Sequence, residues 1–226
     1  MARRFTTGWE HGSAWANVAS NVVVEHSGSL DSPLVYTRGS WSRWALRRGS
    51  LSEWRHDLGV SFSEVYLGVA FAFTGTGGGT RDAFLSMRSS ASNRQFVITR
   101  NTSSLRLEYW RGDAVTLLGT SDTPVASNTW YYLELHVLLS DTAGVVELRL
   151  NGETDLDLTG QNTLGDVSNP NFRQIDLLSH GTANIRVYFD DLCINDTTND
   201  GSGNNSWTGD QAVRLIRVMV MVMLLN

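Results

Sequence analysis

The sequence predicts an all-β fold, a two-sheet antiparallel jelly-roll sandwich, and two observations carry this prediction. Short apolar segments with period-two alternation recur along the chain, and no long segment shows the periodicity of an amphipathic helix. The turns between these segments are rich in Gly, Ser, Thr and Asn, with 21 Gly and only three Pro in 226 residues. Many short strands without intervening helices indicate a sandwich or a barrel.

The apolar segments differ in how many of their faces should be buried. Residues 65–73 are apolar almost throughout, which predicts a strand covered on both faces. Residues 105–110, 130–139 and 145–150 alternate instead, so one face of each should enter the core. The side chains expected to point inward are Leu105, Leu107, Tyr109, Tyr131, Leu133, Leu135, Val137, Val146, Leu148 and Leu150. Asn151-Gly152 then predicts a tight hairpin turn, because both residues tolerate positive φ.

Composition excludes several classes of protein. Hydrophobic residues make up 41% of the chain, which is enough to fill a core. The net charge is -5 and no basic stripe is present, so we expect no nucleic-acid partner. No apolar run is long enough to predict a membrane span. Cys193 is the single cysteine, which excludes an internal disulfide and predicts a buried, inert thiol.

The composition changes near Asp210. Residues 195–210 are polar and rich in turn formers, whereas residues 213–225 are strongly apolar. We therefore predict a sandwich domain over residues 1–210 and a short C-terminal apolar strand or arm over residues 211–226. The apolar side chains of this arm would be buried against the same domain or against a neighbouring subunit. A third alternative is that truncation or a frameshift of the gene produced this terminus. The expected interface residues are Val218, Met219, Val220, Met221, Val222 and Met223.

Four segments resemble concanavalin A-like and laminin G-like jelly rolls. They are Phe5-Thr6-Thr7-Gly8-Trp9-Glu10, then Trp130-Tyr131-Tyr132-Leu133-Glu134-Leu135, then residues 146–152, and then Tyr188-Phe189-Asp190-Asp191-Leu192-Cys193-Ile194. The resemblance covers about residues 5–196 and implies the same sandwich.

The closing stretch carries a narrower resemblance. Residues 195–200, Gly209-Asp210 and Val213-Arg214 resemble the end of jelly-roll proteins of tailed bacteriophages. Gln211-Ala212 interrupts that pattern, and the apolar terminus departs from it.

The first resemblance implies a calcium site. In related jelly rolls an acidic residue of the first strand and an Asp of the last strand hold a structural Ca²⁺, and the matching residues are Glu10 and Asp190 or Asp191. Such a cation would offset the repulsion between adjacent carboxylates. The alternative is that one Asp faces solvent while the other accepts hydrogen bonds from backbone amides.

A glycan site is a second candidate. The outward faces of the alternating strands offer Arg106, Trp110, Tyr132, Glu134 and His136, flanked by Glu108, Glu147 and Arg149. These side chains could form a polar and aromatic platform across adjacent strands. The alternative is ordinary cross-strand pairing. A segment with Trp41, Trp44 and Trp54 among Arg43, Arg47, Arg48 and Arg55 could hold Arg–Trp stacks or a partner-binding patch.

A catalytic pair is not evident. Glucanases of this fold carry E-x-D-x-x-E on one strand, with two carboxylates flanking the scissile bond. The nearest match is Glu153-Thr154-Asp155-Leu156-Asp157, which follows a hairpin turn and lacks the last acid, so we expect an edge strand with solvated carboxylates. Neither H-E-x-x-H nor G-x-S-x-G is present. We therefore expect that the protein is not an enzyme.

The sequence leaves two functions to weigh. The phage-like ending favours a structural protein of a bacteriophage virion, a capsid decoration or tail-associated protein that is assembled in the host cytoplasm and bound to capsid or tail subunits as an oligomer or symmetric array. The alternative is a lectin-like adhesion module for a host-surface glycan, with Ca²⁺ as the expected cofactor if one is bound.

Overall fold

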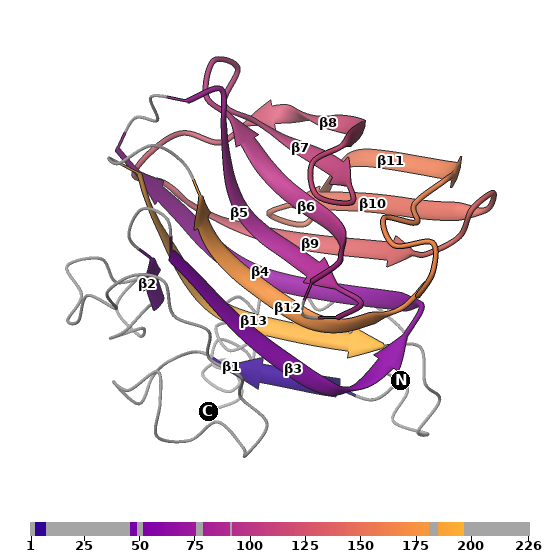
Figure 1. The fold of residues 1–226 in the computed structure, drawn as a ribbon. Helices are drawn as coiled ribbons and strands as arrows, with labels where there is room; N and C mark the ends of the chain where they lie inside the picture. Colours follow the sequence, from indigo (N-terminus) through magenta and orange to yellow (C-terminus); the bar gives the residue numbers. More distant parts are fainter. Residues whose placement is uncertain are drawn as a thin grey trace, which may run out of the picture.

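In the computed structural model the chain is a sandwich of two antiparallel β-sheets (Figure 1). The structure describes residues 3–7, 46–48, 52–75, 79–90, 92–180 and 185–196. Within these ranges every regular element is a strand, and none of them forms a helix that could cross a membrane. The predicted fold class is confirmed. The boundary near Asp210, the C-terminal arm, Glu10, Trp41 and Trp44 lie outside the described residues.

We call the first sheet sheet A. Its strand order is β1-β13-β4-β9-β10-β11, and β2 also pairs with β13. The bounds are β1 Arg3–Thr7, β2 Leu46–Arg48, β4 Glu64–Thr74, β9 Trp130–Leu138, β10 Gly144–Leu150, β11 Glu153–Gln161 and β13 Arg186–Asp196. The first and last described strands are therefore neighbours, with Phe5 opposite Ile194.

The second sheet, sheet B, lies over sheet A in Figure 1 and has the order β3-β12-β5-β6-β7-β8. The bounds are β3 Ser52–Phe62, β5 Arg81–Arg88, β6 Arg94–Asn101, β7 Arg106–Arg111, β8 Thr116–Pro124 and β12 Phe172–His180. Edge strands β8 and β11 lie side by side, and Asp155 of β11 accepts hydrogen bonds from the backbone and hydroxyl of Thr123 at 2.9 and 2.7 Å. Asp155 therefore links the two sheets. The edge-strand position predicted for residues 153–157 is confirmed, but Asp155 is half-buried and bonded to Thr123 rather than solvated.

The core lies between the sheets and follows the predicted alternation. Phe84 of β5 stacks on Phe71 of β4 at 4.9 Å and meets Phe73 edge-on at 5.3 Å. Nine of the ten side chains predicted to point inward lie in or against this core, and Leu105 is the exception. Leu105 precedes β7 and has φ 60°, so it belongs to a turn rather than to the strand.

Two local predictions are also confirmed. Asn151 and Gly152 join β10 to β11 with φ 54° and 89°, which is the left-handed pair that a two-residue hairpin needs. The Cys193 thiol is fully buried in β13, as predicted, with its Sγ 3.8 Å from Asn195 Oδ1, and its inertness stays a prediction.

Candidate functional site

A cluster of arginines surrounds one buried carboxylate on the outer face of sheet B. The Asp176 carboxylate of β12 accepts hydrogen bonds from Arg55 Nε at 2.9 Å, from Ser86 Oγ at 2.8 Å and from Arg88 Nε. Arg94 Nε lies 3.7 Å from the same carboxylate. Four neighbouring strands thus bring their polar side chains to one point, because outward-facing residues of adjacent strands lie opposite one another.

A second polar cluster lies on the same face, on β6 and β7. The Glu108 carboxylate accepts hydrogen bonds from Asn101 Nδ2 at 2.8 Å, Trp110 Nε1 at 3.0 Å and Thr99 Oγ1 at 3.2 Å. The guanidinium of Arg81 lies 3.9 Å from the centre of the Trp110 ring, which is cation–π geometry.

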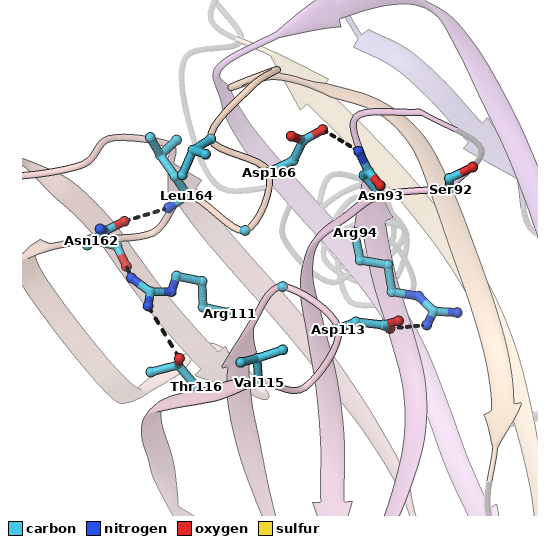
Figure 2. A pocket seen from close by; sticks show the side chains of 13 residues that line it. Ser92, Asn93, Arg94, Arg111, Asp113, Val115, Thr116, Asn162, Leu164 and Asp166 are labelled. Carbon is cyan, nitrogen blue, oxygen red and sulfur yellow. Dashed lines mark hydrogen bonds and ion pairs between the residues drawn. The ribbon is translucent and has the colours of Figure 1, made fainter.

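A pocket of about 530 Å³ opens at one end of sheet B (Figure 2). Three connections form its walls: β5–β6, β7–β8 and β11–β12. The lining residues that carry side chains into this space include Asn93, Arg94, Arg111, Asp113, Thr116, Asn162 and Asp166. Arg94 therefore belongs both to the pocket lining and to the Asp176 cluster.

Gln95 holds the β11–β12 connection in place. Its fully buried carboxamide accepts hydrogen bonds from the backbone N–H groups of Gly165 and Asp166 at 3.0 and 2.9 Å. Its Nε2 donates to the backbone oxygens of Asn169 and Asn171. One side chain therefore satisfies four backbone groups of a segment that has no sheet partner of its own.

Hydrogen bonds and an ion pair fix the charged side chains Asp166 and Arg94 of the pocket. Asp166 accepts hydrogen bonds from Ser89 Oγ at 2.6 Å and Asn93 Nδ2 at 3.0 Å, and these bonds, that of Ser89 foremost, hold the pKa of its carboxyl below the ordinary value. Arg94 forms an ion pair with Asp113. Both signs of charge thus line one concave surface (Figure 2).

Two valines add apolar surface to this polar pocket. Val115 is 80% exposed and Val167 is 72% exposed, and both line the pocket. Hydroxyl-rich ligands with C–H faces use such a mixture of directional hydrogen-bonding groups and small apolar patches.

The platform predicted from the alternating strands does not exist as one surface. Arg106 and Trp110 belong to β7 of sheet B, whereas Tyr132, Glu134 and His136 belong to β9 of sheet A. The alternation was predicted correctly, but two strands of different sheets present their outward faces on opposite sides of the sandwich.

The β9 residues also differ in access. Tyr132 and Glu134 are buried, while His136 stacks on Tyr66 at 4.1 Å and bonds Glu64 Oε1 at 2.8 Å. Their role in ligand binding stays a prediction.

The calcium and interface predictions rest largely on undescribed residues. Asp190 is fully buried and its Oδ1 accepts the backbone N–H of Asp191 at 3.0 Å, while Glu10 and residues 218–223 lie outside the described ranges. The described residues contain no group of three or more His, Cys, Asp or Glu that could hold a metal ion. Calcium binding by Glu10 with Asp190 or Asp191 stays a prediction.

Sequence reasoning missed the pocket residues. Arg94 and Arg111 stand at strand ends beside turns, and nothing local marks them as neighbours of Asn162 and Asp166, about 50 to 70 residues further on. The one available signal was the run Arg111-Gly112-Asp113, a turn that puts charged side chains at a strand end.

Comparison with known proteins identifies the fold. No protein-family model and no curated protein matches the sequence. Among solved structures, the cellulose-induced protein Cip1 matches with a TM-score of 0.59 and 15% identity over 85% of this chain and 97% of that one. Alginate lyase Aly36B matches with a TM-score of 0.54 and 12% identity over 85% and 96%.

A ganglioside-dependent botulinum neurotoxin type C shares the fold over a smaller part of its length. It matches with a TM-score of 0.53 and 10% identity over 78% of this chain and 43% of that one. These three likenesses show a shared jelly-roll β-sandwich. The matched structures give no support to the resemblance to phage virion proteins.

The likeness to alginate lyase overturns the prediction that the chain is not an enzyme. That prediction was wrong because it took the absence of three motifs, E-x-D-x-x-E, H-E-x-x-H and G-x-S-x-G, as a general exclusion of catalysis. A sandwich of the same fold serves as a lyase, so missing motifs exclude only the chemistries that depend on them. The likeness defines the fold and no particular reaction.

Proposed function

We propose that this chain is a carbohydrate-binding β-sandwich protein whose ligand occupies the pocket at the end of sheet B. The observation that carries the proposal is the composition of that pocket. Side-chain donors and acceptors from three connections converge on one cavity whose lining also contains two exposed valines. A sugar needs both kinds of contact, because its hydroxyls donate and accept while its ring presents C–H groups.

The fold supports the same class of ligand. Of the proteins that share it, one is a lyase of alginate and another is a neurotoxin whose cell entry depends on two ganglioside molecules. This support concerns the fold alone, so the residues of the pocket must carry the test.

The test measures glycan binding by the full chain and blocks the pocket with one bulky side chain. A glycan array finds ligands, and calorimetry then compares the native protein with V115W. Val115 is 80% exposed at the pocket, so an indole there occupies ligand space without disturbing the core. We expect a loss of affinity of about tenfold or more, since each tenfold corresponds to about 1.4 kcal/mol of lost contact.

The matched control is V60W, the same substitution at an exposed valine of β3 that does not line the pocket. Its affinity should equal that of the native protein. Binding of no glycan, or equal loss in both variants, would contradict the proposal. Mass spectrometry of the same mixtures tests catalysis, because shortened chains of a bound glycan would make the protein a carbohydrate-active enzyme.

The virion role predicted from the chain's ending is a separate proposal without support in the matched structures. Its test is copurification of the protein with phage particles, in symmetry-related copies that contact capsid or tail subunits through residues 218–223.

A further inference from the structure

Arg111 differs from the other charged side chains of the pocket. Arg94 is paired with Asp113, and the Asp166 carboxylate is satisfied by hydroxyl, amide and backbone donors. Among the described residues, Arg111 donates only to uncharged oxygens, the Asn162 carbonyl at 3.2 Å and Thr116 Oγ1 at 3.3 Å. Within the described part of the chain, its positive charge thus faces the pocket without a carboxylate partner.

The two bonds of Arg111 orient its guanidinium and leave capacity for a ligand. A guanidinium has five N–H donors in a fixed plane, so two bonds leave three donors. Nη1 and Nη2 are held from two sides by the β11–β12 connection and by β8 (Figure 2). A planar group fixed in this way suits a carboxylate, which it can meet with two parallel hydrogen bonds at a small cost in side-chain entropy.

The remaining residues that line the pocket indicate what kind of ligand bears this carboxylate. Asn93 and Asn162 offer amide groups for hydroxyls, and Val115 and Val167 offer apolar surface for a ring face. The volume of about 530 Å³ lies within the range of small-ligand pockets. Repulsion by Asp113 is reduced because Arg94 neutralises it.

We infer that the pocket selects a sugar bearing a carboxylate, a uronate or a sialate, and that Arg111 binds the carboxylate. This inference rests on the proposed carbohydrate function and adds the class of sugar and the residue that selects it.

The experiment compares sugars that differ by the acidic group. One pair is trigalacturonate and galactotriose of the same linkage, which tests uronates. The other pair is sialyllactose and lactose, which tests sialates. Calorimetry should give an affinity about 10-fold to 100-fold higher for the acidic member of at least one pair, the gain expected from hydrogen bonds to a charged group. That preference should disappear in R111Q.

The matched control is R186Q, which removes the same charge from an exposed arginine of β13 in sheet A. The acid preference should persist there. If R111Q folds poorly because it loses the bond to Asn162, a salt titration of the native protein still tests the inference. Raising NaCl from about 0.05 M to about 0.5 M should weaken binding of the acidic sugar and leave the neutral one unchanged.

The outcomes separate the two proposals. Equal affinity for acidic and neutral sugars, or an acid preference that survives in R111Q, overturns the role of Arg111 and leaves carbohydrate binding intact. An acidic affinity that is insensitive to salt also overturns it. Binding of no sugar from either pair or from the array overturns both.

Discussion

At the scale of single residues, Asp176 is the most consequential side chain of the arginine-rich face. It is fully buried, and Arg55, Arg88 and Arg94 converge on it. Guanidinium groups brought this close repel one another unless a carboxylate lies between them. Asp176 is therefore a buried negative charge that the three arginines share.

We predict that D176N destabilises the protein by about 3–5 kcal/mol, because it removes a buried negative charge that three arginines share. Urea unfolding followed by fluorescence measures the free energy of unfolding. The control is D113N, which removes a carboxylate that also pairs with Arg94 but is 70% exposed. It should cost less than about 1 kcal/mol. Similar losses in both variants would contradict the central role of Asp176.

At the scale of elements, the β11–β12 connection decides the shape of the pocket. It is held by Gln95 and packs so tightly that a Cβ on Gly165 would lie 2.3 Å from the Gln95 backbone oxygen and 2.6 Å from that of Arg94. Glycine is required there for space rather than for a left-handed backbone. Contact with β6 therefore sets the position of Asn162, Asp166 and Val167.

We predict that G165A displaces this connection, lowers stability by about 1–3 kcal/mol through overpacking, and abolishes glycan binding at the pocket. Thermal unfolding and calorimetry measure the two effects. G160A is the control: its φ is +65° and nothing lies within 4 Å of the new Cβ, so only backbone strain of about 1–2 kcal/mol is expected. Glycan binding that survives in G165A would show that the connection does not shape the site.

At the scale of the whole molecule, alternation and turn chemistry predicted the sandwich but not its site. The inward faces of β7, β9 and β10 and the turn at Asn151-Gly152 are local features, so the sequence alone predicted them. Which strands share a sheet is a long-range property, and β7 and β9 were therefore joined in error. Bulges add to the difficulty, since one between Ala83 and Leu85 lets Phe84 and Leu85 both enter the core.

The core also conceals a polar pair that no local pattern reveals. Arg100 of β6 points between the sheets, lies 4.0 Å from the Phe73 ring and meets Asp82 at 3.3 Å, with both side chains 1% exposed. An arginine beside an apolar run would ordinarily be placed in solvent. Only the pairing of β5 with β6 supplies its partner, and burial raises the pKa of Asp82 and lowers that of Arg100 despite their attraction.

We expect the two sheets to unfold together, because aromatic side chains of one sheet pack against those of the other. Phe84 of sheet B stacks on Phe71 and lies 6.4 Å from Phe189, both in sheet A. We predict that F84A costs about 3–5 kcal/mol, because it leaves a cavity where both layers meet. Circular dichroism and tryptophan fluorescence should still report one coincident transition in urea.

The matched control for this prediction is L117A, a similar truncation at a side chain of β8 that is 43% exposed. It should change the free energy of unfolding by less than about 0.5–1 kcal/mol, since solvent already surrounds much of that side chain. A loss below about 1 kcal/mol in F84A, or two separate transitions, would mean that each sheet derives its stability from its own strands. The pocket, whose walls include the β11–β12 connection between the two sheets and the ends of β6 and β7 in sheet B, would then lack the rigid frame that selective binding requires.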